Sequence, residues 1–172
     1  GDLSFDVPSG SGAPQAMRAG LQTLDARIDI QGQRIESSLQ ARGDPLGTIN
    51  ARASSPLTWS SDSLVPDLTV PLTGRLDLSL PSLAFTRALV GETWRIDGAL
   101  NAALDLGGSL RDPRVSGQIS GSKLMAVQRE LGMRLTDGEL LATVKDNQLD
   151  VQSLRFLSGK GSVQMSGSLR PD

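Results

Sequence analysis

Apolar and polar residues alternate in run after run of this 172-residue chain, and this pattern limits most strongly what the chain can fold into. In residues 76–80 leucine occupies every second position, and in residues 100–106 aliphatic residues do the same. Successive side chains of a strand point to opposite faces, so a period of two separates the aliphatic residues from the polar ones. The chain is therefore expected to be all-β, mostly one long antiparallel sheet with an apolar face.

A triplet of glycine, any residue and an aliphatic residue opens many of these runs. We expect each such glycine to mark the point at which a strand enters a curved sheet, with the aliphatic residue as the first position on its inner face. Nine of the nineteen glycines begin the triplet: Gly1, Gly47, Gly74, Gly98, Gly108, Gly117, Gly138, Gly161 and Gly167.

The runs and the turn residues between them predict about eleven to thirteen strands. Residues 31–34 have the composition of a hairpin turn, and Asp146-Asn147 of a tight turn. The alternation slips by one residue between Val151 and Leu154, which predicts a bulge or a change of direction. Four prolines between 56 and 81 bracket short pieces, expected to be strand ends or edges because proline cannot donate to a ladder. The region 54–72 is accordingly expected to be irregular.

One short helix is predicted over residues 82–90. Ser82 is a candidate N-cap, apolar residues follow at helical spacing, and Gly91 is a stop signal. A helix of two turns is marginal in water, so it is expected to dock on the apolar face of the sheet, either to fill a core or to act as a lid.

The composition argues against catalysis and against nucleic acid. The chain has no histidine, cysteine or tyrosine, which removes imidazole bases, thiol nucleophiles and common metal ligands. Asp25, Asp29, Asp77 and Asp105 each take a polar position of an alternating run, where nothing suggests the desolvation that tunes a catalytic acid. Seventeen cations and nineteen anions are interspersed without a basic cluster. We expect no enzyme activity, no cofactor, no metal and no nucleic-acid partner.

The sequence says little about the cellular compartment of the protein or about how it is anchored. The lack of cysteine leaves cytosol and periplasm both open, and no signal peptide or apolar run of membrane-spanning length is present. The chain begins already in a strand pattern. We therefore expect residues 1–172 to be a single β domain taken from a longer protein.

A sheet of this predicted size cannot leave its apolar face in water. At about 4.8 Å per strand it would be on the order of 55 Å long, and soluble proteins tolerate only a few hundred Å² of exposed apolar surface. Either the sheet folds on itself as a packed sandwich, or it encloses an apolar guest in a groove. The chain has five aromatic residues, fewer than sandwich cores commonly use, which leans toward a groove.

The segment 91–121 resembles the repeated core of a known family. The family pattern joins a glycine, a strand of alternating aliphatics, Gly-Ser/Thr-Leu, a proline and a closing Val-x-Gly. It is met by Gly98, Leu104, Leu106, Gly108, Leu110, Pro113, Val115 and Gly117. Over residues 70–170 the chain is similar to the TamB family, the inner-membrane component of the translocation and assembly module, which is related to AsmA-like proteins.

This resemblance implies a U-shaped, taco-like sheet with an apolar concave groove, and no catalytic residues. It also implies a periplasmic region of an inner-membrane-anchored protein of a diderm bacterium, acting in phospholipid transport and in outer-membrane protein and autotransporter assembly. An outer-membrane barrel partner of the TamA type would contact regions outside residues 1–172. The residues expected to line the groove are Leu76, Leu78, Leu80, Phe85, Leu89, Leu100, Leu104, Leu106, Val115, Ile119, Leu140, Val144, Leu149, Val151, Val163, Met165 and Leu169.

Three roles for such a face remain open from the sequence. It can carry phospholipid acyl chains, because each buried methylene contributes about 0.8 kcal/mol. It can hold nascent outer-membrane β-strands, with an edge strand adding main-chain hydrogen bonds. The third role is that of a passive structural spacer with a filled core.

Overall fold

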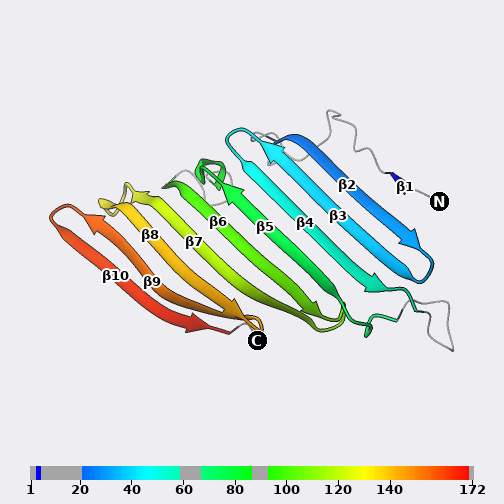
Figure 1. Ribbon diagram of the computed structural model, residues 1–172. Coiled ribbons are helices and arrows are strands. Elements are labelled where there is room, and N and C mark those ends of the chain that lie inside the picture. The colour runs from blue at the N-terminus through cyan, green and yellow to red at the C-terminus, as the bar shows by residue number, and fades with distance from the viewer. Residues whose placement is uncertain (1–2, 5–20, 59–66, 87–92, 171–172) are drawn as a thin grey trace.

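The computed structural model describes residues 3–4, 21–58, 67–86 and 93–170. They form one antiparallel sheet in which each strand pairs with the next along the chain (Figure 1). The strands are β1 (Leu3–Ser4), β2 (Leu21–Gln31), β3 (Arg34–Gly43), β4 (Gly47–Pro56), β5 (Thr73–Leu80), β6 (Trp94–Gly108), β7 (Pro113–Gln128), β8 (Met133–Lys145), β9 (Gln148–Ser158) and β10 (Gly161–Leu169).

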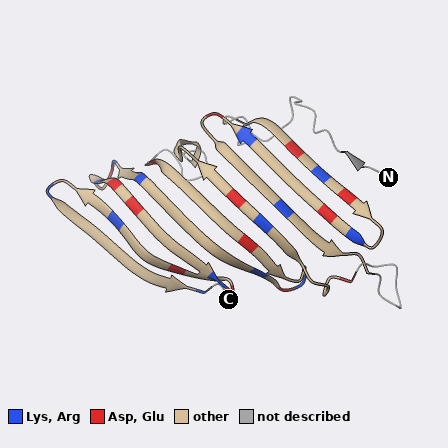
Figure 2. Cartoon of the chain, viewed as in Figure 1, with Lys and Arg blue, Asp and Glu red and all other residues tan. Residues whose placement is uncertain are grey.

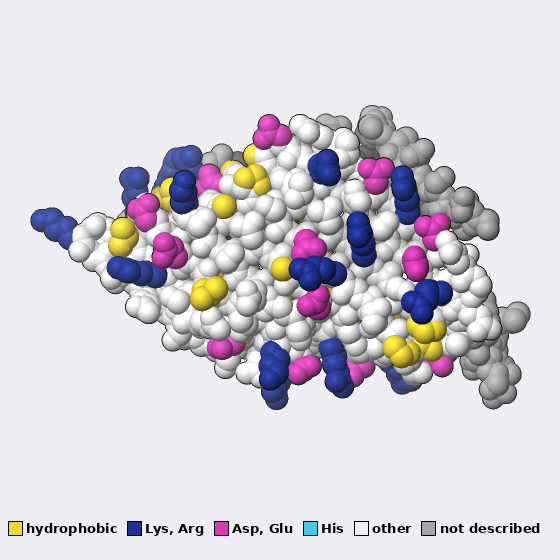
Figure 3. Space-filling view, viewed as in Figure 1, with side chains coloured by type: hydrophobic (Ala, Val, Ile, Leu, Met, Phe, Trp, Pro, Cys, Tyr) yellow, Lys and Arg dark blue, Asp and Glu magenta, His cyan; other side chains and the backbone are white. Residues whose placement is uncertain are grey.

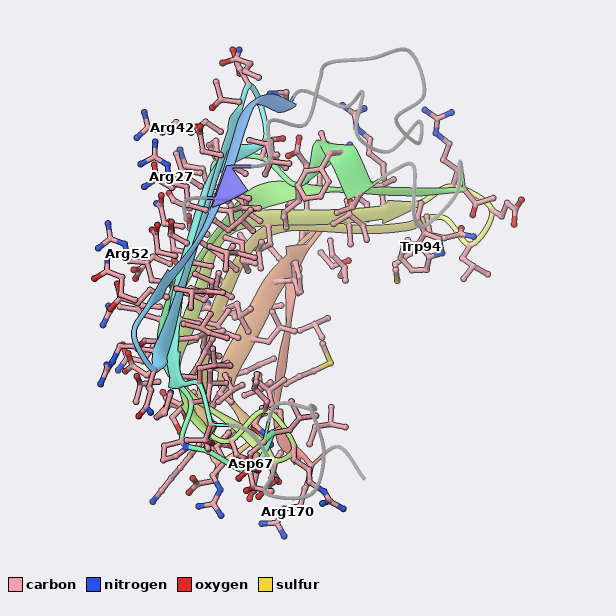
Figure 4. All side chains as sticks on the ribbon, turned by 90° about the vertical axis from the view of Figure 1, so that its right-hand side faces the viewer. Arg27, Arg42, Arg52, Asp67, Trp94 and Arg170 are labelled. Carbon is pink, nitrogen blue, oxygen red and sulfur yellow. The ribbon has the colours of Figure 1, made fainter. Side chains whose placement is uncertain are left out.

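The sheet is open and curved. Seen from the side, it forms a wall that bends over at one end into an arm (Figure 4). All ten described strands belong to this one sheet, so within the described ranges no second sheet packs on it as a sandwich requires. The expected all-β antiparallel fold is confirmed, and the packed sandwich is not formed by this part of the chain.

Fewer strands are described than the eleven to thirteen predicted for the whole chain. The described residues form ten strands, of which β1 has two residues and the other nine have eight to sixteen. The difference arises because β6, β7 and β8 are 15, 16 and 13 residues long. Each of them continues through glycines and polar residues that interrupt the alternation in the sequence.

The predicted turns and the predicted bulge are confirmed. The hairpin between β2 and β3 closes with Gln31 opposite Arg34. Asp146 and Asn147 connect β8 to β9 with φ angles of 47° and 66°, as a two-residue hairpin turn requires. Ala142 pairs with Val151 while Leu141 pairs with Ser153, so Gln152 is the extra residue of a β-bulge.

Strand β5 corrects the interpretation of the proline-rich stretch. The piece 76–80 was expected at a strand end or edge, but β5 is an interior strand that pairs with β4 and β6. Pro71 and Pro81 lie just outside it, so they delimit the strand without weakening its ladder. The irregular region also begins later than residue 54, because β4 continues to Pro56.

Of the predicted helix over 82–90, the structure describes residues 82–86. They include a 3-10 helix of three residues, η2 (Ala84–Thr86), beside the start of β6. Ser82 acts as the predicted cap, since its hydroxyl accepts the N–H of Ala84 at 3.1 Å. Residues 87–90 lie outside the described residues.

A line of β-bulges crosses four strands where the wall becomes the arm. The register shifts at Gly98 between β6 and β7, around Leu124 between β7 and β8, and at Asp137-Gly138 between β8 and β9. Gly98, Lys123 and Asp137 have positive φ angles of 124°, 52° and 50°. Bulges bend a strand and increase its twist, so this line, hereafter the crease, accounts for the bend.

Two of the buried hydrophobic side chains pack at the crease. Leu124 is buried with its backbone against Gly98, and the ring of Phe156 lies directly over Gly138. A side chain at Gly98 would collide with the backbone of Leu124, and one at Gly138 would collide with the ring of Phe156. The hydrophobic residues buried among the described ones are Ala41, Leu80, Ala102, Leu124, Ala142 and Phe156.

The glycine triplets do not mark strand entry as a rule. Gly47 and Gly161 do begin strands, but Gly98, Gly117 and Gly138 lie well inside β6, β7 and β8. At Gly117 the φ angle is 152°, and an added Cβ would meet the carbonyl oxygen of Ala103. Gly98 and Gly117 allow a neighbouring backbone to come close, and Gly138 makes room for the ring of Phe156. Both roles differ from starting a strand.

The crease can be tested with two alanine substitutions in one strand. A Cβ at Gly98 would lie 2.7 Å from Leu124 Cα at an unfavourable φ, whereas at Gly107 nothing lies within 4 Å. We expect Gly98→Ala to lower the free energy of unfolding by at least about 2 kcal/mol, and Gly107→Ala to change it little. Urea denaturation measures both; equal effects would contradict the role assigned to Gly98.

Candidate functional site: the apolar face

The cross-strand pairing builds two apolar rows that run across the sheet from β2 to β10. Residues directly opposite one another in neighbouring strands share a face, so each row lies wholly on one side. The first row is Ala26, Leu39, Ala51, Leu76, Leu104, Gly117, Val144, Leu149 and Leu169; the second is Leu24, Ala41, Ile49, Leu78, Ala102, Ile119, Ala142, Val151 and Gly167. The side that holds both rows is hereafter the apolar face.

The opposite side, hereafter the outer face, is polar. The row between the two apolar rows consists of Asp25, Gln40, Asn50, Asp77, Ala103, Gln118, Thr143, Asp150 and Ser168. Charges of both signs are spread over this face, with few hydrophobic side chains among them (Figure 3). Arg27, Arg42 and Arg52 project from the outer face, away from the arm (Figure 4).

The apolar face is most exposed at its two margins. Ile28 and Ile30 of β2 are each 48% exposed, and at the other margin Met165 and Leu169 of β10 are 49% and 68% exposed. Between the margins the leucines of β5 and β6 are mostly half-buried. The curvature and neighbouring side chains therefore shield the centre of the face, while its margins meet solvent.

Two structures bound the face along the strand direction. At one end the arm overhangs it, and Trp94 lies on the underside of the arm (Figure 4). At the other end the segment 67–72, hereafter the strap, joins the β6–β7 hairpin through an isolated bridge between Pro71 and Ser109. The face is thus a curved apolar wall with an end piece on either side.

The predicted groove-lining residues that lie on strands share the apolar face. Leu80, Leu100, Leu140 and Met165 form part of a third row beside the crease, and Leu106 with Val115 belongs to a fourth beside the strap. Phe85 lies in η2, outside the sheet. Leu89 lies outside the described residues.

The prediction missed the part of the face that β2, β3 and β4 contribute. The sequence alone does not fix how these strands pair with the later ones, because the proline-rich stretch separates them. The alternation was present in the sequence, and the pairing extends both apolar rows through these strands. The residues added are Leu24, Ala26, Ile28, Ile30, Ile35, Leu39, Ala41, Ile49, Ala51 and Ala53.

The acidic residues considered as catalytic candidates lie on the outer face. Asp77 and Asp105 both bind Arg75, with N–O distances of 3.1 Å and 3.4 Å. The hydrogen bond to Asp77, followed by the charges of Asp77 and Asp105, raises the pKa of the Arg75 guanidinium above its ordinary value. In the part of the chain that the structure describes, no three acidic side chains gather as a metal ion would require.

Asp97 ties the arm to the segment that leads into η2. Its Oδ1 atom accepts the N–H of Gly98 and the hydroxyl of Ser82, each at 2.8 Å. These two hydrogen bonds, the one from Gly98 first, hold the pKa of the Asp97 carboxyl below its ordinary value. A half-buried carboxylate thus fixes the backbone at the crease.

Residues 11–120 match the family model described as TamB, N-terminal domain. The chain belongs to the TamB family. The match overlaps the segment 70–170 that carries the resemblance, and it extends that resemblance to the first half of the chain. No significant match was found among curated proteins or among solved structures.

TamB family membership suggests a role in envelope protein assembly. In the described ranges no helix is both long enough and apolar enough to cross a membrane. The feature that this TamB-family chain offers for such a role is the apolar face, since charged side chains are spread over the opposite, outer face (Figure 3) and some of them are paired there.

The Asp97 contacts predict a pH dependence. Because the folded-state pKa is lowered, this carboxylate stabilises the fold fully above its unfolded pKa of about 3.9, and the contribution is lost as pH falls through the folded pKa. We expect Asp97→Asn to lower the free energy of unfolding at pH 7 by about 1 kcal/mol. Its effect should shrink at pH 3.

Urea unfolding at the two pH values measures this change. Asp150→Asn, at an exposed position of the outer face, serves as the matched control. An Asp97→Asn effect that is as large at pH 3 as at pH 7 would contradict the assignment.

Proposed function

We propose that the apolar face is a non-catalytic groove that shelters the acyl chains of phospholipids in transit between the inner and outer membranes. The observation that carries the proposal is the pair of apolar rows, which cross nine strands without a polar side chain. An apolar surface of this extent ordinarily marks a binding site for an apolar partner.

The composition of the face suits transport better than fixed binding. Each buried methylene contributes about 0.8 kcal/mol, so a chain lying along the face is held well. Leucine, isoleucine, valine and alanine offer nearly equal contacts from strand to strand, so displacement along a row changes the binding free energy little. The phosphate headgroup would stay in water at the open margin of the sheet.

The family provides the biological setting of the proposal. We propose that this domain lies in the periplasm as part of an inner-membrane-anchored protein, with an outer-membrane barrel of the TamA type as partner. Sheltered lipid would then serve outer-membrane protein and autotransporter assembly, or phospholipid supply to the outer membrane.

The groove can be tested with adjacent positions of β3 that face opposite ways. Leu39 lies on the apolar face and is 37% exposed, whereas Gln40 is exposed on the outer face. We expect Leu39→Glu to weaken phospholipid binding about tenfold or more, because a carboxylate against hydrocarbon costs more than about 1.4 kcal/mol. Gln40→Glu adds the same charge and should leave binding unchanged.

Native mass spectrometry of the purified chain, with phosphatidylglycerol or phosphatidylethanolamine added, measures this binding. Circular dichroism establishes that both variants are folded. Equal losses in both variants would reject the groove. Wild-type protein that binds neither lipid would favour a passive spacer.

A second candidate function rests on β10. All nine of its residues are exposed, and no charged residue occurs between Lys160 and Arg170 (Figure 2). Edge strands commonly carry charges that discourage pairing, and β10 carries none. We therefore propose β10 as an alternative site at which an alternating strand of a nascent outer-membrane protein adds to the sheet.

Photo-crosslinking distinguishes this candidate from lipid transport. A photoreactive residue at Gln164 should crosslink to an unfolded outer-membrane protein, while one at Thr23 in β2 should not. Crosslinking of equal yield at the two positions would indicate non-specific contact and reject augmentation at β10.

A further inference from the structure

A small cavity lies at the strap end of the apolar face. Its volume is about 130 Å³. One wall is the sheet itself, where Ile35 pairs opposite Ser55 and Ser37 opposite Ala53. The other wall comes from the strap and from the β6–β7 hairpin. Its apolar lining residues are Ile35, Ala53, Leu57, Val70, Leu72 and Leu110.

The strap that closes this cavity is fixed by backbone hydrogen bonds. Asp67 N–H donates to the carbonyl of Thr58 at 2.8 Å, Arg111 N–H to that of Leu68 at 3.0 Å, and Leu72 N–H to that of Gly108 at 2.9 Å. These bonds connect the strap to the end of β4 on one side and to the hairpin on the other. The cavity is therefore preformed in the folded chain.

Most polar side chains around the cavity already take part in hydrogen bonds. Ser37 donates its hydroxyl to the carbonyl of Ala53 at 3.4 Å, and Ser55 donates to that of Pro56 at 3.3 Å. The Asp67 carboxylate accepts the hydroxyl of Thr69 at 2.6 Å and its N–H at 2.9 Å. Few polar groups are left to hold water, and apolar cavities of about 150 Å³ stay dry and take small apolar molecules.

The cavity borders the first apolar row. Ser37, Ala53 and Gly74 are opposite one another in β3, β4 and β5, and two residues along each strand lie Leu39, Ala51 and Leu76 of that row. An occupant of the cavity can therefore continue onto the apolar face without crossing a polar barrier.

We propose that this cavity holds the methyl end of an acyl chain, so that the strap end of the groove receives the tail of a lipid. This inference rests on the proposed lipid groove and names its terminal subsite. The engaged hydroxyls and the aliphatic lining accept a hydrocarbon terminus. A polypeptide strand entering the same space would bring backbone N–H and C=O groups that find few partners there. The cavity thus favours lipid over polypeptide at this end of the face.

Two photoreactive palmitic acids test the subsite on the full 172-residue chain. One carries a diazirine at its methyl end and the other a diazirine near its carboxyl group. We expect the methyl-end probe to label 53–57, 70–72 and 110, as mapped by peptide mass spectrometry. The carboxyl-end probe should label other parts of the apolar face.

Filling the cavity provides the matched comparison. Ala53→Leu adds volume inside the cavity, and Ala103→Leu makes the same change at an exposed position of the outer face. We expect Ala53→Leu to lose methyl-end labelling and Ala103→Leu to retain it. Xenon binding, followed by the ¹²⁹Xe chemical shift, should also be lost in Ala53→Leu. Val70→Phe fills the cavity from the strap and replaces Ala53→Leu if that variant does not fold.

The outcomes separate this inference from the function on which it rests. Methyl-end labelling confined to the apolar face outside the cavity, and unchanged by Ala53→Leu, would overturn the subsite and leave the groove standing. Absence of labelling with both probes would overturn the subsite and the lipid groove together. Loss of xenon binding in Ala103→Leu as well as in Ala53→Leu would also overturn the subsite.

Discussion

Cross-strand register is the constraint on which the rest of this structure depends. The side chains of a strand alternate between faces, so a slip of one residue between any two neighbours would carry every later aliphatic residue to the outer face. From β2 to β10 the pairing keeps two apolar rows and one polar row intact. Where an extra residue occurs at Gln152, the bulge absorbs it and the rows continue on the same face. A single sheet therefore acquires two chemically distinct sides without a second layer.

The two sides divide the physical tasks of the domain. The outer face meets water with charged side chains, some of them paired with one another around Arg75. The apolar face carries none of these charges and can offer hydrocarbon contacts over many strands. Its two ends differ, because the crease brings Trp94 over one end, whereas the strap forms a small aliphatic cavity at the other. A chain-like guest would therefore meet different surroundings at its two ends.

Much of this arrangement could be predicted from the residues. Alternation identified the strands and the faces in the second half, and turn chemistry located the hairpins at Gly32-Gln33 and at Asp146-Asn147. The crease could not be predicted, because a bulge depends on which backbone lies opposite, and Lys123 carries no local signal for positive φ. The extent of β7 was missed for the same reason. Its continuation past Gly121 depends on pairing with β8, which an isolated pattern does not reveal. The strap cavity joins segments that are distant in sequence.

The shape of the sheet and the lining of its face depend on different residues. Curvature comes from backbone conformation at Gly98, Lys123 and Asp137 and from the close approach at Gly117 and Gly138. The lining requires only that every second side chain be aliphatic and of moderate size. Leucine, isoleucine, valine and alanine can replace one another along the rows while the bend stays where the crease puts it. A protein built in this way can diverge far in sequence and keep its geometry, since its fold constrains the apolar–polar pattern more than the identity of each residue.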